Sequence, residues 1–152
     1  MRDCFWILLH FENAAPRGFD AQRDCKSDRD PNYNCIAWAA GDQSTPWWPT
    51  ADPLAPYYWP FLNDEETLDN FVRAFEILGY EDCTPNDSIE DGFEKIAVYA
   101  DAQDVPTHAA KTLPRGVWSS KLGDYEDIEH ATLGILSGRG YGEAKRFLKK
   151  PR

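Results

Sequence analysis

The sequence predicts an α+β fold, in which a central helix packs on an antiparallel sheet of three to five strands. A capped helix signal lies in the first third of the chain, and three strand signals follow one another between residues 93 and 121. Only a few residues separate these strand signals, and such short connections join antiparallel neighbours. Together the two observations favour a domain built from a helix on a sheet.

The first 32 residues are expected to form an N-terminal extension of the core. Residues 1–12 contain a short apolar run, which predicts a strand or an apolar anchor. Residues 13–32 are polar and rich in turn formers, so we expect a loop there, with at most one helical turn near residues 20–26.

The central helix is predicted over residues 35–40. Asn34 is a favourable N-cap, and Gly41 is placed to end the helix. Apolar residues occupy nearly every position, which is typical of a buried helix. Residues 42–62 are predicted to form a structured loop, because their prolines block both helix and sheet. The Trp and Tyr side chains of this loop either cover the core or form a wall of a substrate site.

A second helix is predicted to begin at Asn63 or Asp64 and to end before Gly79. Acidic residues in its first turn suit the helix dipole. Apolar residues recur along it at helical spacing and predict one buried stripe, formed by Leu68, Phe71, Val72, Phe75 and Leu78.

The last third of the chain is predicted to supply the sheet. Residues 93–101, 107–113 and 117–121 form a meander of three strands. We expect residues 124–130 to form a helical turn or a loop. Residues 144–148 fit a last strand or a short helix, and we favour the strand.

Length and charge limit the class of protein. The 152 residues fit a single domain over residues 1–152, with a core at 33–150. The net charge of −10 argues against a nucleic-acid partner, which would need a basic surface. No segment approaches the roughly 20 apolar residues of a membrane span, so we expect no membrane partner.

The four cysteines do not follow a metal-binding pattern. None of them form a C-x-x-C pair, and their spacing fits no zinc template, so we expect no metal and no cofactor. A disulfide framework is not expected in a chain of this length with so few cysteines. We therefore expect free thiols and a cytoplasmic location.

One cysteine and one histidine stand out as candidate catalytic residues. Cys35 is predicted to start a helix, where unpaired N–H groups favour the thiolate. His108 is predicted to open a strand and could serve as its base. From these residues alone, Cys35 could equally be a small buried apolar residue, and His108 an imidazole bonded to the backbone.

Several segments of the chain, taken in order, resemble an uncharacterised bacterial family of small papain-like domains. The papain-like fold in its compact bacterial form includes the cell-wall amidopeptidases of the NlpC type, and lecithin:retinol acyltransferase-like proteins are relatives. The resemblance runs from about residue 32 to residue 148. Its segments are Tyr33–Ala39, Lys95–Tyr99, Thr107–Ala110, Trp118–Gly123, Asp127–His130 and Tyr141–Gly142.

The resemblance implies a papain-like fold and roles for individual residues. Cys35 would be the nucleophile and His108 the general base. Ser120, twelve residues after His108, would stand where the relatives keep a polar group that orients the histidine. Asp124 and His130 are alternatives for this third role.

The sequence thus supports two hypotheses. The first is a cysteine hydrolase, amidase or acyltransferase, acting on an amide or ester in a small molecule, peptide or protein. The second is a non-catalytic papain-like binding module, such as a phage- or defence-associated accessory protein, in which exposed aromatic residues of the loop 46–60 are the contact surface. In the first case we expect the substrate cleft to be lined by Asn34, Trp38, Trp47, Trp48 and Trp59.

Overall fold

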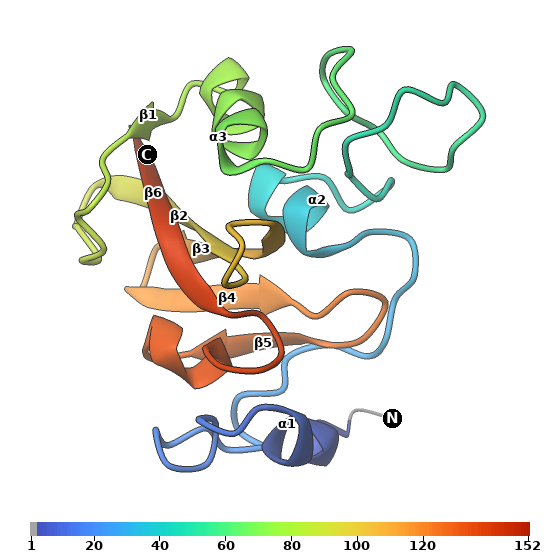
Figure 1. Ribbon diagram of the computed structural model, residues 1–152. Coiled ribbons are helices and arrows are strands. Elements are labelled where there is room, and N and C mark those ends of the chain that lie inside the picture. Colours follow the sequence, from blue (N-terminus) through green and yellow to red (C-terminus); the bar gives the residue numbers. More distant parts are fainter. Residues whose placement is uncertain (1–2) are drawn as a thin grey trace.

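The computed structural model describes residues 3–152 and shows an α+β fold with one antiparallel sheet (Figure 1). The helices are α1 (Phe5–His10), α2 (Cys35–Ala40), α3 (Leu68–Ile77) and a short 3-10 helix (Leu133–Leu136). The strands are β1 (Glu81–Asp82), β2 (Phe93–Ala100), β3 (Pro106–Leu113), β4 (Val117–Lys121), β5 (Asp127–His130) and β6 (Glu143–Pro151).

The sheet has six strands in the order β1-β6-β2-β3-β4-β5, more than the three to five predicted. The meander β2-β3-β4 is confirmed, and so is the last strand, which inserts between β1 and β2. The prediction of a turn or loop over residues 124–130 was wrong, because Asp127–His130 pairs with β4 as a strand. Ile128 is the only aliphatic residue of β5, so its alternating burial gave little hydrophobic signal.

Helices cover both faces of the sheet (Figure 1). On one face, α2 and α3 pack on sheet residues that include Ile96, Val98, Ala109 and Leu148. On the other face, α1 and the N-terminal segment pack on a set that includes Ala97, Tyr99, Ala110 and Phe147. Successive side chains of a strand point to opposite faces, so each strand contributes to both cores. The N-terminal extension is therefore a full layer of the fold.

Residues 5–10 form helix α1, so the prediction of a short strand in this segment was wrong. In α1 the side chains of Ile7 and of the following Phe11 are buried, whereas Phe5 and Leu9 are exposed. This burial follows the helical spacing of i and i+4. The apolar run was too short for its period to be recognised. Among residues 3–152, no helix is long and apolar enough to cross a bilayer.

The two helices on the other face agree with their predicted signals, apart from one boundary. Asn34 caps α2 by accepting a hydrogen bond from the Ala37 N–H at 3.0 Å, and Gly41 ends it with a φ of 87°. Helix α3 is capped by Thr67, later than the predicted Asn63 or Asp64. The Asn63 side chain instead accepts from the N–H two residues ahead, which forms a local turn that competes with the helix.

A disulfide joins Cys4 to Cys25, which corrects the prediction that all four thiols are free. Cys35 and Cys83 are free. The bond links the start of α1 to the end of the turn-rich segment, 21 residues along the chain. No local pattern in the sequence indicates that this segment folds back on itself. Disulfides persist in oxidising surroundings, so the argument from free thiols to a cytoplasmic location no longer holds.

We expect the disulfide to stabilise the N-terminal layer. Replacing both Cys4 and Cys25 by alanine should lower the free energy of unfolding by about 3 kcal/mol, because the bond restricts the unfolded chain. Denaturant titration of both proteins measures this difference. Cys83→Ala, which removes a half-buried free thiol, is the control and should have a smaller effect. Equal stability of the double variant and the native protein would contradict the expectation.

Candidate functional site

Cys35 is the first residue of α2, and its side chain is buried. The backbone N–H groups of Ala109, Ile36 and Cys35 itself face the sulfur and lower its pKa, as does the positive charge of Lys121. Burial outweighs these groups and raises the pKa of the Cys35 thiol to about 11. At neutral pH the sulfur therefore carries its proton, although its surroundings are polar.

The cation beside Cys35 is a fully buried lysine at the end of β4. Lys121 Nζ donates to the carbonyl oxygen of Asp30 at 2.6 Å, to that of Tyr33 at 3.0 Å and to that of Gly123. Burial lowers the pKa of this ammonium group, while nearby carboxylates raise it. The three bonds fix the segment that leads into α2 on the end of β4. Sequence reasoning missed this lysine, because a lysine in a strand is usually exposed.

His108 lies on β3 and is completely buried. Its Nε2 lies 2.9 Å from Ser120 Oγ, and the same oxygen lies 2.8 Å from His130 Nε2. His130 Nδ1 in turn lies 3.0 Å from the carbonyl oxygen of Thr132. The structure therefore brings the predicted pair of His108 and Ser120 together. It also adds His130 as the next member of a hydrogen-bond chain.

The direction of this hydrogen-bond chain follows from its last acceptor. The Thr132 carbonyl can only accept, so His130 Nδ1 donates to it. Burial lowers the pKa of His130 to about 4, so its Nε2 is unprotonated and accepts from the Ser120 hydroxyl. The Ser120 oxygen then accepts from His108 Nε2–H. Burial also lowers the pKa of His108, so its Nδ1 carries a free lone pair.

The thiol and the imidazole come from opposite faces of the sheet. His108 pairs with Tyr99 and points to the α1 face, whereas α2 covers the other face. No described residue forms a hydrogen bond with His108 Nδ1, so the pair is not hydrogen-bonded. Pairing between β3 and β4 is confined to Lys111–Leu113 of β3. The Ala109 N–H, beyond this paired part, faces the Cys35 sulfur.

Tyr141 covers the imidazole. Its ring stacks on His108 with centroids 4.2 Å apart and planes 6° apart, and its carbonyl accepts from the Thr107 hydroxyl at 2.5 Å. Burial and the nearby Cys35 both raise the pKa of the Tyr141 hydroxyl. At Gly142, a Cβ atom would lie 2.1 Å from the Ala100 carbonyl oxygen, so only glycine lets this segment approach β2 so closely.

Asn34 and Trp38, two of the residues predicted to line the cleft, connect α2 to the following loop and to the sheet by hydrogen bonds. Besides capping α2, Asn34 accepts from the Trp47 N–H at 3.1 Å and donates to the Trp47 carbonyl at 2.8 Å. The Trp38 indole donates to Ser119 Oγ at 3.0 Å, and the Lys111 ammonium lies 4.0 Å from its ring centre. Both side chains are thus engaged in structural contacts.

The loop aromatics cover the core on the α2 and α3 face. Trp47 and Trp59 are buried, which agrees with the first of the two alternatives for this loop, and neither can belong to the exposed contact surface of the binding-module hypothesis. The Trp47 indole donates to Asp42 at 2.8 Å. Trp48 is half-buried and packs edge-on against Phe71 of α3. His108 faces the opposite core, so these three rings do not line its surroundings.

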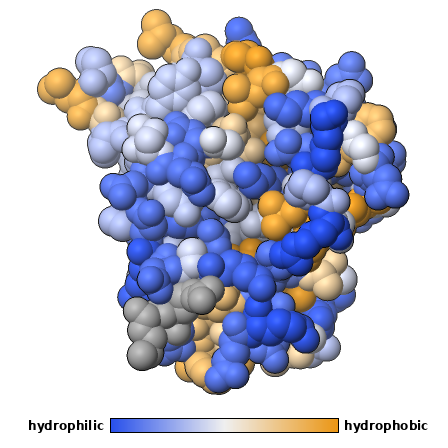
Figure 2. Space-filling model, turned by 180° about the vertical axis from the view of Figure 1, so that it is seen from behind, coloured by the Kyte–Doolittle hydropathy of each residue, from blue (hydrophilic) through white to orange (hydrophobic). Residues whose placement is uncertain are grey.

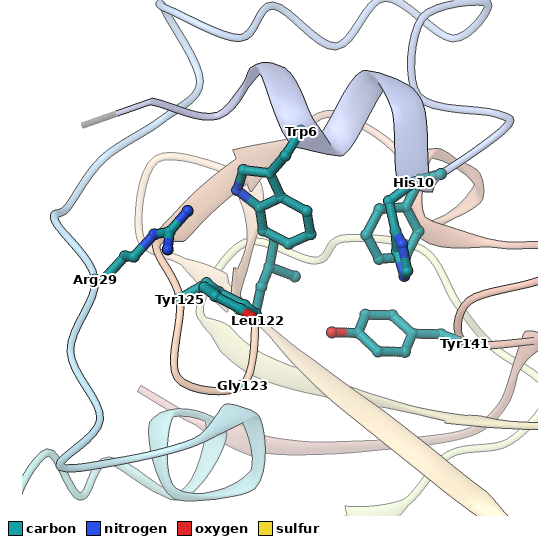
Figure 3. Close-up of a pocket in the computed structure, with 8 residues that line it drawn as sticks. Trp6, His10, Arg29, Leu122, Gly123, Tyr125 and Tyr141 are labelled. Atoms are coloured by element: carbon teal, nitrogen blue, oxygen red, sulfur yellow. The ribbon is translucent and has the colours of Figure 1, made fainter.

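A cavity of about 380 Å³ lies next to Tyr141, between α1 and the turn after β4 (Figure 3). Trp6, His10 and Phe11 line it on the N-terminal side, and Leu122 and Gly123 line it from the turn after β4. Sequence reasoning missed this cavity, because half of its lining comes from the N-terminal extension. Within residues 3–152, no cluster of His, Cys, Asp or Glu could hold a metal ion.

The comparisons with known proteins give one match. No curated protein and no solved structure matches the chain. Residues 24–149 match DUF7689, a domain of unknown function. The match includes Cys35, His108, Ser120, Lys121, His130 and Tyr141. Because it spans most of the 152 residues, the chain belongs to the DUF7689 family.

Proposed function

We propose that this protein is a papain-like cysteine hydrolase, amidase or acyltransferase that acts on an amide or ester, with Cys35 as nucleophile and His108 as general base. One observation carries the proposal. A buried hydrogen-bond chain leaves a free lone pair on His108 Nδ1, and the next residue, Ala109, directs its N–H at the Cys35 sulfur. A base held in one tautomer, with a lone pair free to take the thiol proton, is what nucleophilic catalysis requires.

In the proposed reaction, His108 Nδ1 takes the thiol proton as the Cys35 sulfur attacks the substrate carbonyl carbon. A C–S bond forms, and the carbonyl oxygen becomes an oxyanion. Protonated His108 then gives its proton to the leaving amine or alcohol as the C–N or C–O bond breaks, which leaves a thioester. Water or an acceptor alcohol or amine attacks the thioester, with His108 as base, and the thiol is restored.

The surroundings of the sulfur favour negative charge during attack. The N–H groups at the start of α2 and the Ala109 N–H face the sulfur, and the Lys121 cation lies near it. Ordered donors of this kind stabilise an oxyanion strongly where water is excluded. In the resting arrangement the thiol keeps its proton, so the sulfur and His108 Nδ1 must approach each other for reaction.

The second candidate function is a non-catalytic binding module, and one observation favours it. The loop beside α2 and α3 exposes several large apolar side chains, and Figure 2 shows hydrophobic groups protruding at this corner of the molecule. They are Leu54 at 91 %, Leu62 at 96 %, Tyr57 at 45 % and Tyr58 at 47 % exposure. Exposed apolar groups of this kind are typical of interaction surfaces.

Acylation by p-nitrophenyl acetate distinguishes the two functions. At a pKa of about 11, only about one Cys35 thiol in 10⁴ is ionised at pH 7. Without a base, the half-buried Cys83 should therefore react faster. With His108 as base, we expect Cys35 to be acetylated faster than Cys83, as measured by mass spectrometry of peptides.

Substitutions test whether His108 is responsible. His108→Asn should slow acetylation of Cys35 about 100-fold or more, the usual effect of a general base. Cys83→Ser is the control and should leave the Cys35 rate unchanged. If Cys83 is acetylated faster in the native protein and His108→Asn has no effect on Cys35, the catalytic proposal fails.

The pH dependence of stability tests the proposed protonation states. His108 and His130 are neutral when folded, because burial lowers both pKa values, but both gain protons in the unfolded chain below about pH 6.5. Stability should therefore fall as the pH drops from 6.5 towards 4. Each histidine should contribute a slope of about 1.4 kcal/mol per pH unit.

His130→Asn should reduce this slope by about 1.4 kcal/mol per pH unit, because one histidine no longer gains a proton on unfolding. Denaturant titration at several pH values measures the slope for each variant. His10→Asn is the matched control, since His10 is exposed and lies outside the hydrogen-bond chain. Identical slopes in the native protein and in His130→Asn would show that His130 is already charged in the folded state.

A further inference from the structure

We propose that the cavity beneath α1 binds an aromatic group that carries a carboxylate, as part of the substrate of the Cys35–His108 site. This inference rests on the proposed function for its link to catalysis, while the binding itself can be measured separately. The cavity holds about 380 Å³, a size suited to a small ligand or one amino-acid side chain.

The cavity adjoins the reacting pair through two of its lining residues. One face of Tyr141 stacks on His108, and Figure 3 shows its hydroxyl end directed into the cavity. Gly123 also lines the cavity, and its carbonyl accepts from Lys121, whose charge acts on Cys35. A group bound here would contact Tyr141, which covers His108, and its attached amide or ester would extend from there towards Cys35.

Aromatic side chains from three parts of the chain form the walls. The Trp6 ring lies 5.1 Å from Tyr125, and the Phe11 ring lies 5.1 Å from Tyr141, as measured between centroids. Both pairs are tilted at angles between 50° and 55°. Tilted and offset rings attract a further ring at similar distances, so these walls favour an aromatic occupant over a polar one.

The carboxylate preference comes from Arg29, which lies at one side of the cavity (Figure 3). Its guanidinium sits 4.8 Å over the Tyr125 ring, and its Nε lies 3.5 Å from buried Glu126. Glu126 also accepts from the Trp6 indole at 3.0 Å and so orients both groups. The guanidinium donates no hydrogen bond to any described residue. Its fork can therefore bind a carboxylate in a bidentate manner.

Calorimetric titration of the native, disulfide-bonded protein with three probes tests both preferences. N-acetyl-L-phenylalanine has the ring and the charge, N-acetyl-L-phenylalaninamide lacks the charge, and N-acetylglycine lacks the ring. We expect the first to bind at least tenfold more tightly than the other two. Comparable dissociation constants for all three, or no saturable binding of the first, would overturn the proposal.

Substitutions locate the binding. Arg29→Gln should weaken N-acetyl-L-phenylalanine at least fivefold and leave the amide unaffected. Arg23→Gln is the matched control, because Arg23 is similarly exposed and pairs with Asp24. Tyr125→Ser should weaken both aromatic probes, unlike Tyr57→Ser, which changes an equally exposed tyrosine. Equal effects of each variant and its control would place the ligand elsewhere.

The two proposals fail separately. If Cys35 is inert to acylation but N-acetyl-L-phenylalanine binds as expected, the cavity is a binding site without catalysis. If Cys35 is acylated in a His108-dependent manner but none of the probes bind, the cavity proposal is wrong and the catalytic one stands.

Discussion

The site depends on one buried cation, the Lys121 ammonium group. Three backbone carbonyls satisfy its three N–H donors, two of them from the segment that leads into α2. Burying a charge costs several kcal/mol unless it is fully hydrogen-bonded, so the lysine and these carbonyls stabilise only one arrangement. That arrangement sets α2 against the end of β4 and gives Cys35 a positive neighbour. The location of the sulfur therefore follows from the lysine as much as from the helix.

The buried polar atoms around His108 are also hydrogen-bonded, with one exception. His130, Ser120 and His108 Nε2 each have partners, and a carbonyl that only accepts fixes every proton in the chain. Within this hydrogen-bond chain, only His108 Nδ1 has no partner among the described residues. An unpaired buried polar atom costs about 1–3 kcal/mol, so such an atom usually has a functional reason. In the proposed function, this atom is the base that takes the proton of the Cys35 thiol.

The parts of the fold that sequence could predict are those with local signals. The Asn34 cap and Gly41 define α2 without any tertiary information, and the short connections of β2, β3 and β4 define the meander. The missed features depend on contacts distant in sequence. Lys121 is bonded to Asp30 across 91 positions, and the disulfide gives no local pattern. The pairing of His108 with Ser120 was predicted through a resemblance, whereas His130, considered there only as an alternative to Ser120, is the next member of the same hydrogen-bond chain.

The residues proposed for catalysis and those proposed for substrate recognition lie in different parts of the chain. Cys35, His108 and the groups that act on them all lie within the part of the chain that matches the family, residues 24–149. Trp6, His10 and Phe11, which close the cavity, lie before it. The cavity therefore lies between two parts of the chain: residues from the turn after β4 and Tyr141 on one side, and the N-terminal segment, which the disulfide ties down, on the other. A substitution in α1 could alter which group fits beside Tyr141 without moving the Cys35 sulfur or the His108 imidazole. Under the two proposals, the hydrogen-bond chain determines the chemistry, and α1 determines which group reaches it.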